Sequence, residues 1–487
     1  MHPARRLIAA LLLGTAALAL PARADDKQAV DALNLPMSVV QESSKSWKDL
    51  SEAVAALSAP PVKVGKDFNL TTIWPGMKDW DKVKAWAAAN EPMGKAILAA
   101  QSKVVFGMPY GRGSVPPSMV EKGIFVGLGE GLTVFVSDPA YLKAFDTMLA
   151  YTAAEIYRLG EEQKFAEAFD LGIATLRVLR QVADQQLLEE KRWAMERMSE
   201  SCSVQRDFMF AFLDKIPAAV LKKAGFTGYP YIRASDGERL RRLEMPEGDR
   251  VLAELMLVQL FDAKGQPDAV KMAATMGDLQ SRNEPLTRFG AAKRWTQIAE
   301  VPHGSFDASR NRLTSIYDDW WRRWRVRYYD TLLDNPTVIS RTNKVRYAMV
   351  LLMVRDLEGL FTLRQRLNAE LNGTAIAASV CAAYRELGSW PRELKATYTQ
   401  FTVKRMDYDP WDPAYGRWQY QRLDSPRAIE CEYGRLQISG ALLYARGVDK
   451  EDGSAAKATV DGVSGDFVAW PPLRAVSRAS GGTGIAK

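Results

Sequence analysis

Two amphipathic segments joined at a glycine occupy residues 138–179 and constrain the fold more than any other part of the chain. Asp138-Pro139 is typical of a helix start, because aspartate caps free amide groups and proline fits the first helical turn. Apolar residues then recur near a 3.6-residue period up to Gly160, and a second such series begins near Glu162. The pattern predicts a helical hairpin, the unit of helical-repeat proteins, without a regular repeat period.

Helical patterns dominate the rest of the chain up to the C-terminal quarter. We expect a mixed N-terminal region over 25–137, a helical domain over 138–340, and a long helix followed by an α+β module over 341–474. The fold class is therefore mainly α, with repeat-like helical hairpins and a small C-terminal sheet.

Glycines and small polar residues indicate where these patterns stop. We expect interruptions of the long helix near Gly359 and at Asn372-Gly373. The series Gly127, Gly129 and Gly131 lacks the strand and helix of a phosphate-binding loop, so we interpret it as a turn. The composition of residues 475–487 predicts a disordered tail.

Residues 1–24 have the pattern of a secretory signal peptide. Arg5 and Arg6 precede an apolar run over 7–20, and Ala22 and Ala24 form an A-x-A cleavage pattern. The alternative is a retained membrane anchor, but this run is short of the roughly 20 residues that span a bilayer. The longest later apolar run, over 347–354, is shorter still. We therefore expect a periplasmic or secreted protein without a transmembrane anchor after cleavage.

Charge and histidine content exclude several classes of function. Loss of three arginines with the signal peptide lowers the net charge from +7 to +4, which is mild and argues against a nucleic-acid-binding protein. His303 is the only histidine after residue 24, so sites built from several histidines are excluded. His303 follows Val301-Pro302 and precedes Gly304, which is typical of a loop rather than of a general base.

Five short motifs follow one another in the last quarter of the chain. A helix ending in Tyr-Arg-Glu-Leu-Gly at 384–388 is followed by Trp390-Pro391, an Asp-Pro-Trp loop at 409–411, a strand over 439–445, and an Asp-Phe-Val-Ala-Trp close at 466–470. This order resembles the periplasmic module of major type II secretion pseudopilins. It is equally similar to uncharacterised exported bacterial proteins that carry the same ending behind a helical domain. We recognise no family for the helical body.

The resemblance implies a helical spine with a small sheet, and a calcium ion in the late loops. The matching ligand positions are Asp449 and Asp466, and Asp452 and Asp461 are further candidates. The alternative is that all four are turn residues, because aspartate favours turns. An ordinary signal peptide replaces the prepilin leader, so pilus assembly is not implied.

Three cysteines follow the cleavage site. Cys381 belongs to the predicted helix and Cys431 to a later segment of the same module, so a Cys381–Cys431 disulfide is one hypothesis and two buried thiols are the alternative. Cys202 then remains single.

The segment 315–333 is rich in tryptophan and arginine. Trp320 and Trp324 fall on one helical face, which predicts a buried aromatic face with a solvated Arg/Asp side. The alternative is an exposed face that contacts lipid headgroups or sugars.

The sequence favours a non-catalytic binding or scaffold protein of the cell envelope that binds an unknown protein partner. The alternative is a secreted hydrolase that cleaves glycans through two carboxylates. The candidate pairs Asp318-Asp319 and Glu189-Glu190 are adjacent in sequence, and neighbours on a helix point apart.

Overall fold

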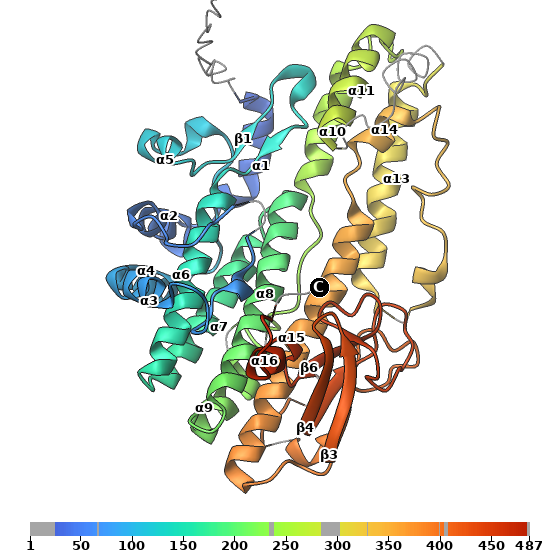
Figure 1. Ribbon diagram of the computed structural model, residues 1–487. Coiled ribbons are helices and arrows are strands. Elements are labelled where there is room, and N and C mark those ends of the chain that lie inside the picture. Colours follow the sequence, from blue (N-terminus) through green and yellow to red (C-terminus); the bar gives the residue numbers. More distant parts are fainter. Residues whose placement is uncertain are drawn as a thin grey trace, which may run out of the picture.

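The computed structural model describes residues 25–65, 68–232, 238–283, 302–328, 330–398, 400–403 and 408–484. The predicted signal peptide lies outside the described residues. Helices α8 (Leu188–Phe212) and α15 (Leu357–Leu387) pack side by side in the middle of the molecule (Figure 1). The N-terminal helices lie on one side of this pair, and the C-terminal sheet lies on the other.

The predicted helical hairpin is confirmed. It consists of α6 (Tyr141–Glu161) and α7 (Phe165–Val182), and both helices pack against α8. Helix α6 begins three residues later than Asp138, because Ser137 and Asp138 pair as strand β2 with β1 (Gly127–Leu128). The glycine-rich stretch is therefore a small hairpin and a turn, as expected.

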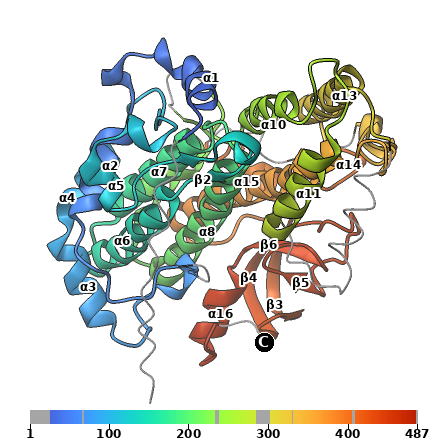
Figure 2. The same cartoon turned by 90° about the horizontal axis from the view of Figure 1, so that it is seen from above.

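The remaining helices extend the two flanks of the α8/α15 pair. Seen from above, α1–α5 lie beside α6 and α7, whereas α10, α11, α13 and α14 form a separate group near one end of α15 (Figure 2). Their bounds are α1 (Lys27–Ser38), α2 (Trp47–Ala56), α3 (Trp80–Ala89), α4 (Glu91–Ala100), α5 (Pro117–Glu121), α9 (Ala218–Lys223), α10 (Gly248–Gln259), α11 (Ala269–Asn283), α13 (Phe306–Arg325) and α14 (Ala348–Met353).

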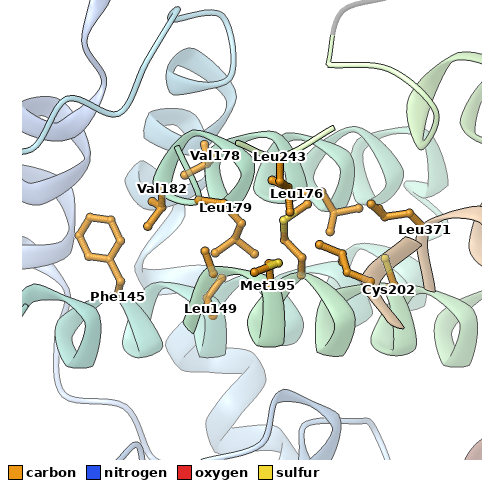
Figure 3. Close-up of a cluster of buried hydrophobic side chains, with 14 of the residues drawn as sticks. Phe145, Leu149, Leu176, Val178, Leu179, Val182, Met195, Cys202, Leu243 and Leu371 are labelled. Carbon is orange, nitrogen blue, oxygen red and sulfur yellow. The ribbon is translucent and has the colours of Figure 1, made fainter. Parts of the chain in front are cut away.

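One cluster of buried apolar side chains joins segments that lie far apart in the sequence. Its buried side chains run from Ala29 to Trp470, so the helical body and the C-terminal module share a core. Figure 3 shows a part of it in which Leu176 and Leu179 of α7, Met195 and Cys202 of α8, and Leu371 of α15 meet. Removal of this apolar surface from water stabilises the folded state by roughly 25 cal/mol for each Å² buried.

The long helix α15 differs from the expectation at one of its two predicted breaks. A short break separates α14 from α15 just before Gly359, but α15 continues through Asn372-Gly373. A side chain at Gly373 would bring its Cβ within 2.7 Å of the Trp418 ring and 2.8 Å of the Ala469 Cβ. Gly373 therefore serves close packing of the C-terminal module, which outweighs its low helix propensity.

The C-terminal module contains a small sheet, as predicted. Strands β3 (Gln419–Cys431) and β4 (Gly434–Ala445) form a long antiparallel hairpin, and β6 (Asp466–Trp470) pairs antiparallel with β4. The short β5 (Ala458–Thr459) adds a parallel edge, which gives the strand order β3-β4-β6-β5. The fold class predicted from the sequence is therefore confirmed.

The predicted disordered tail over 475–487 is wrong at its start, where residues 475–479 are helical. Helix α16 spans Leu473–Ala479, and its residues up to Ser477 are buried. Arg474 and Arg478 both bind the buried Asp207 of α8, at 2.8 and 3.3 Å. These tertiary ion pairs order a segment whose local composition is typical of disorder. Residues 485–487 lie outside the described residues. In the described part of the chain, every helix is too short or too polar to cross a bilayer.

Candidate functional site

A cavity of about 870 Å³ lies where the end of α13, the middle of α15 and two loops meet. This volume is typical of a ligand-binding pocket. Arginines and aromatic residues dominate its wall, and the described lining contains six guanidinium groups against two carboxylates. The lining residues are Arg239, Arg241, Arg242, Leu243, Glu244, Trp324, Arg325, Val326, Arg327, Tyr328, Arg364, Asn368, Asn372, Tyr408, Asp409, Pro410 and Tyr415.

The segment 238–244 forms the first wall of the cavity. Leu240 and Leu243 are buried, and Figure 3 shows Leu243 among the core side chains near Leu176. Arg241 and Arg242, which lie between these two leucines, line the cavity. Arg241 donates to the Oδ1 atom of Asn372 on α15, at 3.4 Å, which ties this wall to the long helix. The apolar anchors therefore hold a charged segment in place without neutralising it.

Helix α15 forms the floor of the cavity through residues spaced four apart. Arg364, Asn368 and Asn372 lie on one face because this spacing repeats once per helical turn. Asn368 donates to the Tyr328 hydroxyl. The four-residue spacing explains how one helix presents a guanidinium and two amides to the same space.

Arg364 also orders the second wall, which follows the end of α13. Its Nη1 atom donates to the Trp324 carbonyl at 2.7 Å, and its Nε atom donates to the Tyr328 hydroxyl at 3.2 Å. The guanidinium carbon lies 4.2 Å from the Trp324 ring centroid, a cation–π distance. The Trp324 indole in turn donates to the Leu243 carbonyl at 2.7 Å, so the two walls are joined directly.

The loop 408–416 of the C-terminal module closes the third side. The rings of Tyr408 and Tyr415 are stacked with centroids 4.0 Å apart and an angle of 9° between their planes. Tyr415 has a φ of +61°, a backbone conformation that residues other than glycine rarely adopt, and the residue is 40% exposed. The loop therefore holds an exposed aromatic ring at the cavity in a conformation that costs about 1 kcal/mol or more.

Asp409 is held by the backbone of its own module. Both of its oxygens accept backbone amides, from Trp411 and from Arg446, each at 2.8 Å. Burial raises the pKa of Asp409 to about 6, although those two hydrogen bonds act in the opposite direction. Asp409 therefore fixes the loop, and it is partly neutral in mildly acidic solution.

The electrostatics of the cavity favour a bound anion. Among the described residues, no carboxylate forms an ion pair with Arg241, Arg242 or Arg364. Burial, and next the charge of Arg239, lower the pKa of Arg241. Guanidinium groups are suited to carboxylate, phosphate and sulfate, because their planar N–H groups match two oxygens at once. The arrangement is thus built to bind a ligand that carries several negative charges.

The four aspartates predicted to bind calcium lie in the loops around β5 and β6, outside the cavity. Asp449 and Asp452 raise the pKa of Asp466, after burial as the main cause, so these three carboxylates are neighbours. Each also accepts a nearby backbone amide, and Asp466 accepts two, from Gly453 and Ala455. Asp461 caps a turn of its own at Val463. Within the described residues, no group of three or more acidic, histidine or cysteine side chains has the geometry of a metal site.

The predicted Cys381–Cys431 disulfide is wrong. Cys381 is a buried thiol near Tyr420, at the start of β3, and it adds to the burial that raises the pKa of that tyrosine. Cys431 ends the same strand, so it lies roughly 30 Å or more from Tyr420 at ~3.3 Å per residue. A disulfide needs Cα atoms within about 7 Å of each other. Cys202 is a third free thiol in the described chain, as expected.

The predicted aromatic face of the segment 315–333 is buried at Tyr317, Trp320 and Trp324, as expected. Trp320 and Trp324 are 4% and 6% exposed, which contradicts the alternative of a membrane-contacting face. Trp321 is the exception, because it is exposed and contacts Arg325. Arg323 pairs with the buried Asp319 at 3.1 Å, so the Arg/Asp side is only partly solvated.

The carboxylate pairs considered for hydrolysis are not brought together across a cleft. Asp319 is engaged by Arg323, whereas Asp318 is exposed. Glu190 is enclosed by the hydroxyls of Tyr110 and Tyr141, at 2.8 and 2.7 Å. His303 lies in the loop before α13, as predicted, and does not line the cavity.

Sequence analysis did not identify the arginine cavity. Its residues come from four separate segments, and the sequence of only one of them indicates a charged wall. In that segment Arg239, Arg241 and Arg242 alternate with the buried Leu240 and Leu243. Alternation of leucine and arginine outside a regular helix is the pattern that would have indicated a charged wall.

Comparison of this chain with protein-family models, with curated proteins and with solved structures found no match.

Proposed function

We propose that this protein is a non-catalytic binding protein that holds an anionic ligand in the arginine cavity. The observation that carries the proposal is that Arg241, Arg242 and Arg364 line one cavity of about 870 Å³ and that no carboxylate of the described residues forms an ion pair with any of them. Clustered like charges repel one another, and a fold retains such a cluster at a cost unless a counter-charge binds there.

The direct test is titration of the protein with small anions, with heat as the readout. Sulfate and tripolyphosphate should bind, and Arg241→Gln should lower their affinity about tenfold, because one charge-assisted contact is lost. Arg322→Gln is the matched control, since Arg322 lies on α13 and is exposed but does not line the cavity. Binding that is absent, or that is equally affected by both variants, contradicts the proposal.

The proposed setting is the cell envelope. The signal-peptide pattern at 1–24 and the pseudopilin-like order of motifs over 375–472 support export, and together they favour a soluble envelope protein that presents its C-terminal module to a partner protein. Fusion of residues 1–24 to a reporter that folds only outside the cytoplasm tests export. A reporter that stays inactive contradicts it.

Calcium binding in the late loops remains a separate prediction. The neighbouring carboxylates of Asp449, Asp452 and Asp466 support it, because calcium prefers several oxygens on one loop. Calcium should raise the melting temperature, and Asp449→Ala should abolish that shift. If neither calcium nor a chelator moves the transition, the loop is held by its own hydrogen bonds alone.

A further inference from the structure

We infer that protonation of Glu190 controls how firmly helix α1 is held on the helical body. This inference is independent of the proposed anion-binding function. Glu190 lies in the first turn of α8, and the residue is 0% exposed. Burial of a charged carboxylate is costly unless a cation replaces its lost hydration, whereas a neutral, hydrogen-bonded carboxyl is buried at far lower cost. The protonation state of Glu190 therefore affects the stability of whatever surrounds it.

Uncharged donors enclose the Glu190 carboxyl. Tyr141 of α6 donates to its Oε1 atom at 2.7 Å, and Tyr110 donates to its Oε2 atom at 2.8 Å. The Leu187 amide also donates to Oε2, at 3.3 Å. Among the described residues, no lysine or arginine forms an ion pair with Glu190. Three neutral donors replace only part of the hydration that the ionised carboxylate would have in water.

The charged groups around this carboxyl do not offset its burial. Lys191 of the same helix donates to a backbone carbonyl at 2.7 Å, and Asp249 of α10 is paired with Arg355 at 3.4 Å. Burial and then Glu190 raise the pKa values of the two tyrosines, and Asp249 and Glu189 add to this effect. Burial likewise raises the pKa of Glu190 to about 7, although its hydrogen bonds and Lys191 act in the opposite direction.

The turn that begins α8 also holds α1. The Gln186 amide donates to the Tyr110 hydroxyl at 2.7 Å, so the turn fixes the same hydroxyl that binds Glu190. The Gln186 side chain donates to the Leu33 carbonyl of α1. Asn34 of α1 exchanges two hydrogen bonds with the Tyr110 backbone, both at 2.9 Å. A continuous series of hydrogen bonds therefore connects the Glu190 carboxyl to α1.

Helix α1 depends on these polar contacts because it buries little apolar surface. Its buried residues are Ala29 and Leu33, whereas Leu35 is 68% exposed. Elements with few buried apolar contacts open locally at a lower free energy than the core. When Glu190 loses its proton, we therefore expect the turn at the start of α8 to rearrange and α1 to open locally, while α6, α7 and α8 stay folded.

Hydrogen exchange of the full chain between pH 5 and pH 8 tests this inference. Protection factors of residues 27–38, which divide out the intrinsic pH dependence of exchange, should fall about tenfold or more over this range. Those of α7 should not follow. The direction is set by the pKa of Glu190, which lies above its ordinary value of 4.5. The stabilising contribution of the protonated carboxyl is therefore complete below about pH 4.5 and is lost as the pH rises through 7.

Three variants assign the effect to Glu190. Glu190→Gln keeps the size of the side chain but cannot ionise, so the protection of α1 should become nearly independent of pH. Glu52→Gln is the matched control, because Glu52 is an exposed carboxylate on α2 in the same N-terminal region, and it should keep the full fall. Tyr141→Phe removes one donor to the ionised carboxylate, so the fall should move to a higher pH. A merely structural role of Tyr141 would lower protection equally at every pH.

Three results overturn the inference. One is a protection of α1 that stays constant from pH 5 to pH 8 in the unchanged chain. The second is an equal fall in Glu190→Gln and in the unchanged chain. The third is a parallel fall in α7, which would indicate global unfolding instead of local opening. If Glu190→Gln does not fold, a fall that Tyr141→Phe leaves at the same pH overturns it. None of these results affects the anion-binding proposal, which titration with anions tests separately.

Discussion

Arginines serve two different purposes in two regions of this molecule. Between α8 and α15, Arg206 pairs with Glu370 at 2.6 Å, and both side chains are almost completely buried. Arg206 also donates to the Thr374 hydroxyl at 2.7 Å. In the cavity, Arg241 and Arg242 are partly exposed, and no described carboxylate pairs with either of them.

This difference in pairing distinguishes arginines that stabilise the fold from arginines that are available to bind a ligand. A buried guanidinium is stable only when a carboxylate and hydrogen bonds replace its lost hydration. A cluster whose arginines form no ion pair with a carboxylate keeps part of its hydration and can bind an external counter-charge. Charge pairing, rather than the number of arginines, therefore predicts where a ligand binds.

Substitution of Glu370 should have the largest effect on stability. Glu370→Gln leaves the buried Arg206 without its counter-ion and should lower the free energy of unfolding by about 3–5 kcal/mol. Chemical denaturation measures it. Glu254→Gln, in the more exposed pair with Arg250, should cost about 0.5 kcal/mol or less. Equal losses of stability in the two variants would show that the buried pair contributes no more than the exposed one.

Substitution of Asp207 should have the second-largest effect. Asp207 binds Arg474 and Arg478 of α16, so Asp207→Asn should cost about 2–4 kcal/mol and loosen the C-terminal helix. Limited proteolysis should then cut after residue 472 faster than in the unchanged protein. A tail that stays resistant shows that apolar contacts alone hold α16.

The affinity of the cavity for anions should increase as the pH falls. The folded pKa of Asp409, about 6, lies above its ordinary value of 3.8, so the carboxyl becomes neutral as the pH falls through 6. The cavity then gains positive charge, and the affinity for sulfate should rise roughly three- to tenfold between pH 7 and pH 5. Asp409→Asn should flatten this dependence. The same shift means that the stabilising effect of protonated Asp409 is complete below pH 4 and is lost as the pH rises through 6.

Removal of the cavity arginines should have the smallest effect on stability. Arg241→Gln and Arg242→Gln relieve like-charge repulsion, so the free energy of unfolding without ligand should change by about 0.5 kcal/mol or less, or increase. Thermal unfolding at low salt measures it. A loss of several kcal/mol would mean that these arginines are structural, like Arg206.

Much of the fold is local in origin and was predictable for that reason. The 3.6-residue apolar period gives α6 and α7, Gly388 ends α15 because glycine readily adopts the left-handed backbone found there, and the strand pattern over 439–445 gives the second half of β4. Where the expectation failed, contacts between distant segments were responsible. Gly373 continues a helix because Trp418 and Ala469 pack on it, and the start of the predicted tail is helical because Asp207 binds Arg474 and Arg478 of α16.

The sequence by itself determined the helical hairpin and the mainly α class, because these depend on neighbours within a few residues, whereas the small C-terminal sheet was expected from the resemblance of its motifs. Only the tertiary structure decided that Arg241, Arg327 and Arg364 line one cavity, and that Cys381 of α15 lies near the start of β3 whereas Cys431 lies at the end of that strand. The physical reason is that periodicity reports which side of its own element a residue occupies. It does not report which other element covers that side.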